Sequence, residues 1–274
     1  MRVIRHGSQC NNSCIFCTRA GVEYETLPSD NPLTENAAYR ATQKPFSDSG
    51  VDVSIGDVGG AFAVVAGFAV DAMVSGNGVV VVVGREPTLC VGLPDVVANA
   101  VRSGANCVVL RSNARRLAYS AYVAHLVSAG LTGVCVGLHG STAPMHDCHT
   151  NVDGSFSQTV RGVRNAVKQG LRVAICCIVT RSNYRHVGEI VRLAGALGVS
   201  TVFFKQPSES LRFSDCRHRV FAHAELVVPY LDGALECAHR VGVALRVDSR
   251  LTSVSNPAIS SASAPAQRQR SGCD

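Results

Sequence analysis

The sequence has no tryptophan, few other aromatic residues and no apolar segment at its start. Phe and Tyr account for the 5% of its 274 residues that are aromatic. Val, Ala and Gly must therefore fill the core, which favours helices packed tightly on a sheet over a β-sandwich. The opening residues, MRVIRHGSQC, lack the apolar run of a secretory signal. For the twelve cysteines we accordingly expect a cytoplasmic, reducing location, where cysteines bind metals, act in catalysis or are buried as small apolar groups.

Strong charge of one sign and long apolar runs are scarce as well. The formal net charge is +6, and the basic residues are scattered, whereas a nucleic-acid site gathers them on one face. We therefore expect no nucleic-acid partner, and the mild excess suits an acidic partner, such as an electron carrier, about as well as a nucleotide or peptide. The one long apolar run, residues 58–74, contains Asp71 and three glycines and is slightly short for a bilayer. It predicts a buried helix and no membrane association.

Strand and helix signals alternate about six times along the chain. The run of β-branched residues at 79–83 is typical of a parallel strand covered on both faces. The other expected strands are residues 2–6, 107–111, 134–138, 171–180, 199–205 and, more weakly, 243–247. Helices are expected at residues 94–103, 115–129, 156–169, 186–197 and 219–240, three of them ended by Gly130, Gly170 and Gly198.

This alternation predicts a parallel α/β sheet with helical crossovers. A complete eightfold barrel usually takes about 250 residues, so we predict a partial (β/α)6 TIM-like barrel in one core domain, residues 1–252. Residues 18–56 show no sustained period and form an irregular excursion. Residues 253–274, rich in Ser, Ala and Pro, are expected to be disordered. Chemistry in such barrels lies at the carboxyl ends of the strands.

Three cysteines follow the first expected strand in the segment Cys10-Asn-Asn-Ser-Cys14-Ile-Phe-Cys17. Thiolates this close together in one loop can wrap three corners of a cubane cluster. Three ligands leave the fourth iron open to a small molecule. Two alternatives remain: chance proximity in a cysteine-rich chain, or a structural zinc site with His6 as the fourth ligand.

The Cys-x3-Cys-x2-Cys spacing, with aromatic Phe16 before the last cysteine, resembles the signature of radical S-adenosylmethionine (SAM) enzymes. The resemblance implies a [4Fe–4S] cluster on Cys10, Cys14 and Cys17, with SAM chelating the open iron. It also implies reductive cleavage of SAM to a 5′-deoxyadenosyl radical that takes hydrogen from a substrate. A one-electron donor such as flavodoxin or ferredoxin would supply the electron.

Further segments resemble SAM-contacting parts of that family. Gly84-Arg85-Glu86-Pro87 is similar to its Gly-Gly-Glu-Pro segment, which holds the SAM amino group, although Arg85 replaces a glycine. Ser112-Asn113-Ala114 resembles Thr-Asn-Gly, with Ala114 in place of the glycine. Residues 137–140 resemble Ser-Leu-His-Gly without the serine. The implied cofactor-binding residues are Gly84, Glu86, Ser112, Asn113 and Phe16.

Other polar groups are weaker candidates. Arg181 and Asn183 follow the expected strand at residues 171–180. They either contact SAM or the substrate, or they belong to an ordinary loop at the start of a helix. We expect no metal site at His139, His146 and His149, because their spacing suits no helix face. The strand cysteines, at positions 90, 107, 135, 176 and 177, are expected to be core residues.

The resemblance leaves the substrate open. No second cysteine cluster surrounds Cys216 or Cys237, so one cluster is expected. With a barrel mouth covered only by residues 18–56 and 139–151, a small molecule is favoured over a peptide. The alternative is a non-catalytic α/β binding protein with a structural zinc or iron–sulfur site.

Overall fold

The computed structural model describes residues 2–6, 9–17, 78–208 and 220–252. The expected helix at residues 58–74, the excursion at residues 18–56 and the tail at residues 253–274 lie outside these ranges. Within the described part, no helix is both long and apolar enough to cross a membrane.

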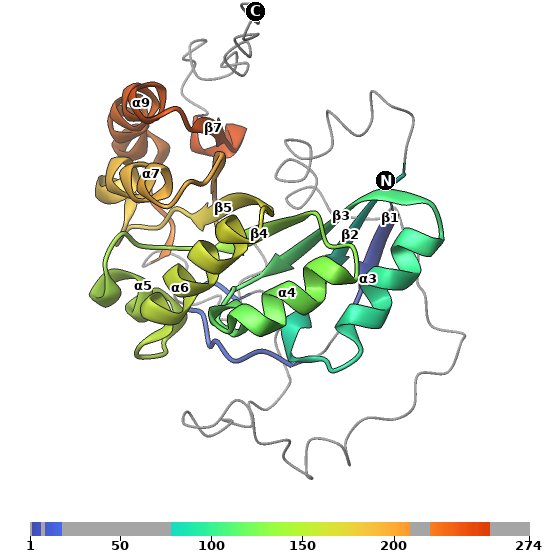
Figure 1. The fold of residues 1–274 in the computed structure, drawn as a ribbon. Coiled ribbons are helices and arrows are strands. Elements are labelled where there is room, and N and C mark those ends of the chain that lie inside the picture. Colours follow the sequence, from blue (N-terminus) through green and yellow to red (C-terminus); the bar gives the residue numbers. More distant parts are fainter. Residues whose placement is uncertain (1, 7–8, 18–77, 209–219, 253–274) are drawn as a thin grey trace, which may run out of the picture.

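One parallel sheet organises the fold, and its seven strands follow the order of the chain (Figure 1). They are β1 (Arg2–Arg5), β2 (Gly78–Val83), β3 (Ala105–Ser112), β4 (Gly133–Gly137), β5 (Arg172–Ile178), β6 (Thr201–Lys205) and β7 (Ala244–Val247). Each neighbouring pair is parallel, and β1 and β7 are the edges of the described sheet. The fold is therefore the expected partial barrel, in which β7 follows the sixth strand–helix unit.

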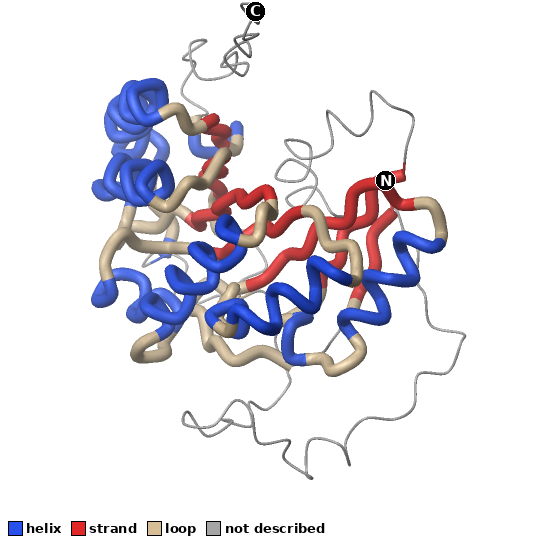
Figure 2. The backbone as a smooth tube through the Cα atoms, viewed as in Figure 1, coloured by secondary structure: helices blue, strands red, loops and turns tan. Residues whose placement is uncertain are grey.

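Helices cover one face of this sheet, as Figures 1 and 2 show. They are α3 (Leu93–Arg102), α4 (Ser120–Ser128), α5 (Ala143–Thr150), α6 (Ser155–Lys168), α7 (Val187–Ala196) and α9 (Ala224–Val241). Short 3-10 turns lie at η1 (Pro87–Leu89), η2 (Arg116–Ala118), η3 (Tyr184–His186) and η5 (Ser249–Leu251). Gly170 and Gly198 follow α6 and α7 with φ values of 78° and 74°, so these helices end as expected.

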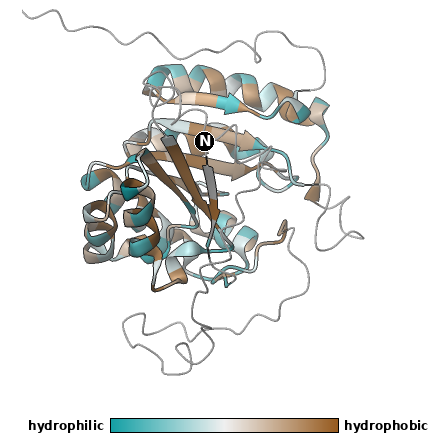
Figure 3. Cartoon of the chain, turned by 90° about the vertical axis from the view of Figure 1, so that its right-hand side faces the viewer, coloured by the Kyte–Doolittle hydropathy of each residue, from teal (hydrophilic) through white to brown (hydrophobic). Residues whose placement is uncertain are grey.

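The strands bury most of their side chains on both faces, which is why they are mainly apolar in sequence and mainly brown in Figure 3. On the helix-covered face, Val82, Leu110 and Ile175 belong to the main core. Since successive strand residues point to opposite faces, a second set lies on the inner face of the barrel. It comprises Val79, Val81, Val83, Cys107, Val109 and Ala174, with Cys135, Cys176 and Phe203 beside them.

The cysteines expected in the core are largely there. Cys107, Cys135, Cys176 and Cys177 are buried, whereas Cys90 is only half-buried. Two helix expectations were wrong in detail. The helix expected at residues 115–129 is divided into η2 and α4, and α5 was not expected at all.

Candidate active site at the carboxyl ends of the strands

The cysteine loop, residues 9–17, is attached to the carboxyl-terminal end of α5. The Ser13 amide donates a hydrogen bond to the Thr150 carbonyl at 2.9 Å, and the Ile15 amide donates to the His149 carbonyl at 3.1 Å. The last carbonyls of a helix have no partner within it. The cysteine loop satisfies two of them, so α5 serves as its support.

The loop that follows β3 holds the cysteine loop from another side. The Arg115 guanidinium donates to the Asn11 carbonyl and, at 2.9 Å, to Asn12 Oδ1. Its Nε donates to Gln158 Oε1 at 2.6 Å, and Asn113 Nδ2 donates to Asn11 Oδ1 at 2.6 Å. From the sequence, Arg115 is expected only as the start of a helix, because nothing in the local pattern sets it apart from other arginines.

The three candidate ligands Cys10, Cys14 and Cys17 are half-buried and form no disulfide with another described cysteine. Burial raises the pKa of Cys10 to about 11 and that of Cys14 to about 12. The other thiols of the loop raise both values further, whereas the Arg115 charge lowers that of Cys10. Cys10 and Cys14 therefore stay protonated at neutral pH until a metal displaces their protons.

The three thiols lie in one neighbourhood of the structure. Among the described residues, no three His, Cys, Asp or Glu side chains gather closely enough to hold one metal ion. His6, the fourth ligand of the zinc alternative, keeps its Nε2 buried without a hydrogen-bond partner. Yet the three thiols interact electrostatically in every pairing. A cubane cluster takes such a set of neighbouring thiols, since each thiolate binds a different iron.

Glu86 is enclosed by hydrogen-bond donors of the protein. Its side chain is 1% exposed, and its Oε1 accepts from Ser112 Oγ at 2.6 Å and from both the hydroxyl and the amide of Thr88. Its Oε2 accepts from the Asn113 amide at 2.6 Å. The Glu86 amide in turn donates to the Gln9 carbonyl at 2.9 Å. Glu86 thus joins β2, β3 and the cysteine loop, and burial raises its pKa while the four donors oppose that rise.

The segment similar to Thr-Asn-Gly keeps a glycine-like turn despite Ala114. Ala114 has a φ of 61°, a left-handed conformation that L-residues rarely adopt, and its amide donates to Ser112 Oγ at 2.9 Å. The turn also packs closely against α6. A Cβ on Gly162 of α6 would lie 2.1 Å from the Ala114 carbonyl oxygen, so the helix and the turn fit only with glycine at that position.

The histidines near α5 come together beside the cysteine loop. The His139 ring lies 5.8 Å from that of His146 and 6.4 Å from that of His149, between centroids. Phe16 packs edge-on against His139 at 4.5 Å. The expectation that this spacing suits no helix face was wrong for His146 and His149, because α5 places residues three apart on one face.

Hydrogen bonds determine which nitrogen of each histidine carries the proton. Nδ1 of His139 accepts from the last amide of β5 at 3.2 Å, and Nδ1 of His146 accepts from the His139 amide at 3.1 Å. Nδ1 of His149 lies 2.6 Å from the Met145 carbonyl and must donate, so its Nε2 accepts, with Thr180 Oγ1 2.8 Å away. Burial lowers the pKa of all three, that of His146 to about 4. All three rings are therefore neutral at pH 7.

Asn183 belongs to a structural turn. It is fully buried; its Oδ1 accepts from the Thr180 amide at 2.7 Å, and its Nδ2 donates to the carbonyls of His139 and Ile178, each at 2.9 Å. The helix-start alternative is therefore correct for Asn183. Arg181 is exposed beside it.

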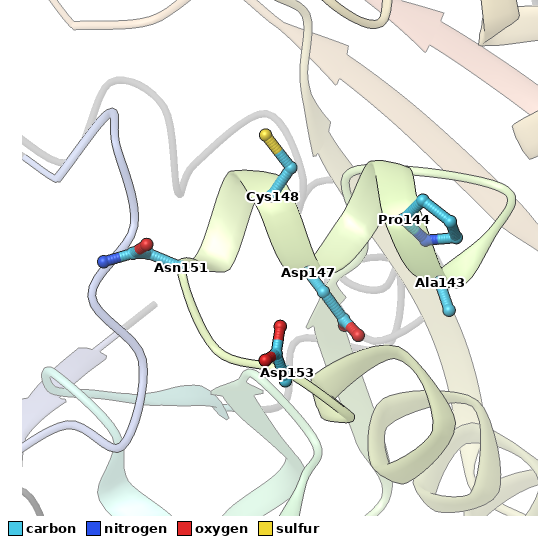
Figure 4. A pocket seen from close by; sticks show the side chains of 6 residues that line it. All are labelled: Ala143, Pro144, Asp147, Cys148, Asn151 and Asp153. Atoms are coloured by element: carbon cyan, nitrogen blue, oxygen red, sulfur yellow. The ribbon is translucent and has the colours of Figure 1, made fainter.

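A shallow pocket lies on the outer side of α5 (Figure 4). It is lined by Ala143, Pro144, Asp147, Cys148, Asn151 and Asp153, none of which is a candidate site residue. The Asp147 carboxylate in it already accepts from the amides of Gly154 and Phe156 and from Ser155 Oγ. Asp147 therefore caps the start of α6, and the pocket is separate from the candidate site.

No family model matches the chain, but individual proteins do. It is 26% identical over 125 residues to an AdoMet-dependent heme synthase of Oleidesulfovibrio alaskensis, covering 46% of this chain and 32% of that protein. It is 24% identical over 191 residues to a probable GTP 3′,8-cyclase of Metallosphaera sedula, covering 69% of this chain and 50% of that one. The chain thus spans half or less of the length of these relatives.

Solved structures share the fold. Streptococcus suis SuiB bound to its precursor peptide SuiA superimposes with a TM-score of 0.59 at 13% identity, covering 90% of this chain and 48% of that one. The structure of anSMEcpe with bound AdoMet and a peptide superimposes with a TM-score of 0.58 at 15% identity, covering 89% and 62%. At such identities the superpositions establish the fold alone.

Proposed function

We propose that this chain, which is related in sequence to radical SAM enzymes and has their fold, holds a [4Fe–4S] cluster on Cys10, Cys14 and Cys17 and cleaves SAM reductively. The observation that carries the proposal is the attachment of the cysteine loop. Hydrogen bonds from α5, the β2 loop and the β3 loop hold it over the carboxyl ends of the strands. Catalytic groups of barrel enzymes lie at this end.

When bound, the cluster and SAM would supply a one-electron cleavage whose 5′-deoxyadenosyl radical removes hydrogen from the substrate. The chain's own residues bind and orient. Arg115 offsets the negative charge of the deprotonated thiols, and Phe16 seats the cysteine loop on His139. The backbone of Gly84 and the side chains of Ser112 and Asn113 are our proposed SAM contacts.

In this proposal the main role of Glu86 is to position its neighbours, and SAM binding is secondary. Four hydrogen bonds occupy its carboxylate, three of them on Oε1. A carboxylate offers about four acceptor sites, two on each oxygen, so Oε2 retains one for the SAM ammonium. Glu86 therefore positions Ser112 and Asn113 first, and contacts SAM through Oε2 alone.

We favour a small molecule as the substrate and a flavodoxin or ferredoxin as the electron donor. SuiB and anSMEcpe were solved with peptides, which makes a peptide the second candidate substrate. A non-catalytic zinc or iron–sulfur protein is not favoured, because the sequence relatives are named as enzymes.

Anaerobic reconstitution tests the central proposal. The protein should bind about four irons per chain and, with SAM and a strong one-electron reductant, release 5′-deoxyadenosine and methionine. Cys14→Ala should abolish both results, whereas Cys148→Ala, at an exposed cysteine on α5, should change neither. Zinc in place of iron after reconstitution, or intact SAM beside a fully loaded cluster, would contradict the proposal.

A further inference from the structure

Two cations lie on the inner face of the barrel near the carboxyl ends of its strands. Arg111 lies two residues after Val109, an inner-face residue of β3. Lys205 ends β6, two residues after the inner-face Phe203. Because side chains alternate along a strand, Arg111 and Lys205 share the inner face, at the end where the cysteine loop lies.

The inner face is open at this point. Arg111 is exposed although β3 is a central strand with neighbours on both sides. Lys205 is half-buried. Arg111 also acts electrostatically on His139, which contacts Phe16 of the cysteine loop. Arg111 therefore lies within electrostatic range of the ring that supports the cysteine loop.

These two cations lack a matching negative charge. Within the described ranges, neither forms an ion pair. Asp248 acts on Lys205, but its carboxylate already accepts hydrogen bonds from Arg250 Nε at 3.1 Å and from Nη2 at 2.7 Å. Partial burial of Lys205 and repulsion by the charges of Arg111 and Arg250 lower the pKa of Lys205. Cations that share a face in this way are stabilised when an anion joins them.

The thiols of Cys135 and Cys176, which also lie on the inner face, are affected by the same two positive charges. Both feel the charges of Arg111 and Lys205. A hydrogen bond from Cys135, together with those charges, lowers the pKa of Cys176 to about 7. The charges of Arg111 and Lys205 thus reach the same two thiols, so the two cations act on one region of the inner face.

We propose that Arg111 and Lys205 bind an oxyanion group of the substrate, so that the substrate is a small molecule with a carboxylate or a phosphate. This inference rests on the proposed function, since it places the anionic group on the side of the barrel next to the cysteine loop. An Arg fork and a Lys point charge on separate strands would hold the group from two directions. The rest of the molecule would then extend toward the proposed SAM site.

The test is a calorimetric titration of the reconstituted, SAM-bound protein at low ionic strength. Inorganic phosphate and succinate serve as probes, because they separate a phosphate from a carboxylate preference. At least one should bind, and Arg111→Gln and Lys205→Gln should each weaken it by about tenfold to a hundredfold, the range for a charged hydrogen bond. Arg111→Lys should lose less, because it keeps the charge. Lys168→Gln, at an exposed lysine on α6, should have no effect.

Absence of binding by both probes, or equal binding by wild type and both Gln variants, would overturn the inference. Iron content and SAM cleavage are measured on the same samples. A loaded, SAM-cleaving protein that ignores both anions refutes the oxyanion site alone. A protein that binds anions through Arg111 and Lys205 but takes up no iron refutes the proposed function alone.

Discussion

Glu86→Gln is the sharpest test of how the site is held together. The wild-type carboxylate accepts hydrogen bonds from four donors, contributed by Thr88, Ser112 and Asn113. A glutamine has nearly the same shape but presents one oxygen and one NH2 group. If the oxygen faces Ser112 and Thr88, the NH2 meets the Asn113 amide at the position now 2.6 Å from Oε2. Two donors then face each other.

The magnitude follows from those contacts. A hydrogen bond to a charged group contributes about 1.5–3 kcal/mol, and a buried donor left without a partner costs about 1–3 kcal/mol. Opposing this, a neutral amide avoids the burial cost that raises the pKa of Glu86. Turning the amide over leaves the Asn113 bond intact but places NH2 against the Thr88 amide. We therefore expect Glu86→Gln to lower the free energy of unfolding by about 2–3 kcal/mol.

Urea unfolding at pH 7, followed by circular dichroism, measures this loss. Thr88→Val is the matched control: it removes one of the three donors to Oε1 and keeps the backbone donor, so a loss of about 1.5 kcal/mol, the low end for one hydrogen bond to a charged group, is expected. If Glu86→Gln is as stable as wild type to within about 0.5 kcal/mol, the carboxylate does not hold these donors, and our account of Glu86 as a positioning residue is wrong.

Four further outcomes are expected. Gly162→Ala should lower the free energy of unfolding by about 1–3 kcal/mol, because its Cβ would lie 2.1 Å from the Ala114 carbonyl oxygen; unchanged urea unfolding would show that α6 shifts freely. Ala114→Gly should be stabilising by about 0.5–1 kcal/mol in the same assay, since the left-handed cost of an L-residue exceeds the entropy cost of glycine. The folded-state pKa of His146 is depressed from 6.5 to about 4, so the stability that its neutral ring contributes is present above pH 6.5 and is lost as the pH falls toward 4. Over that window the free energy of unfolding of wild type should fall by about 3 kcal/mol more than that of His146→Asn. Equal pH profiles of the two proteins would contradict the buried neutral imidazole. Arg115→Gln should lose its visible iron–sulfur absorbance faster to a chelator than wild type does, because its guanidinium orders the cysteine loop; equal rates would place Arg115 outside the cluster's support.

The alternation of strands and helices could be predicted because its signals are local. An unbroken β-branched run such as residues 79–83 needs only its own side chains to indicate a strand covered on both faces. A glycine after an amphipathic run, as at Gly170, marks a helix end for a reason confined to that turn. The cysteine triplet could also be recognised from the sequence, since its three thiols share one loop of eight residues. α5 was missed because its polar histidines show no apolar stripe and its stability comes from neighbours.

Only the tertiary structure determines which hydrogen bonds hold the site together. Asn113 and Asn11 lie far apart in the chain yet share a hydrogen bond, and Arg115 acquires its role from loop carbonyls about a hundred positions away. Glu86 looks like a ligand-binding carboxylate in sequence, but two of its four donors come from Ser112 and Asn113, which the sheet brings beside it. A single strand's pattern determines which face a side chain takes. Whether that side chain's polar atoms are satisfied internally or remain free for a ligand depends on partners that only folding supplies.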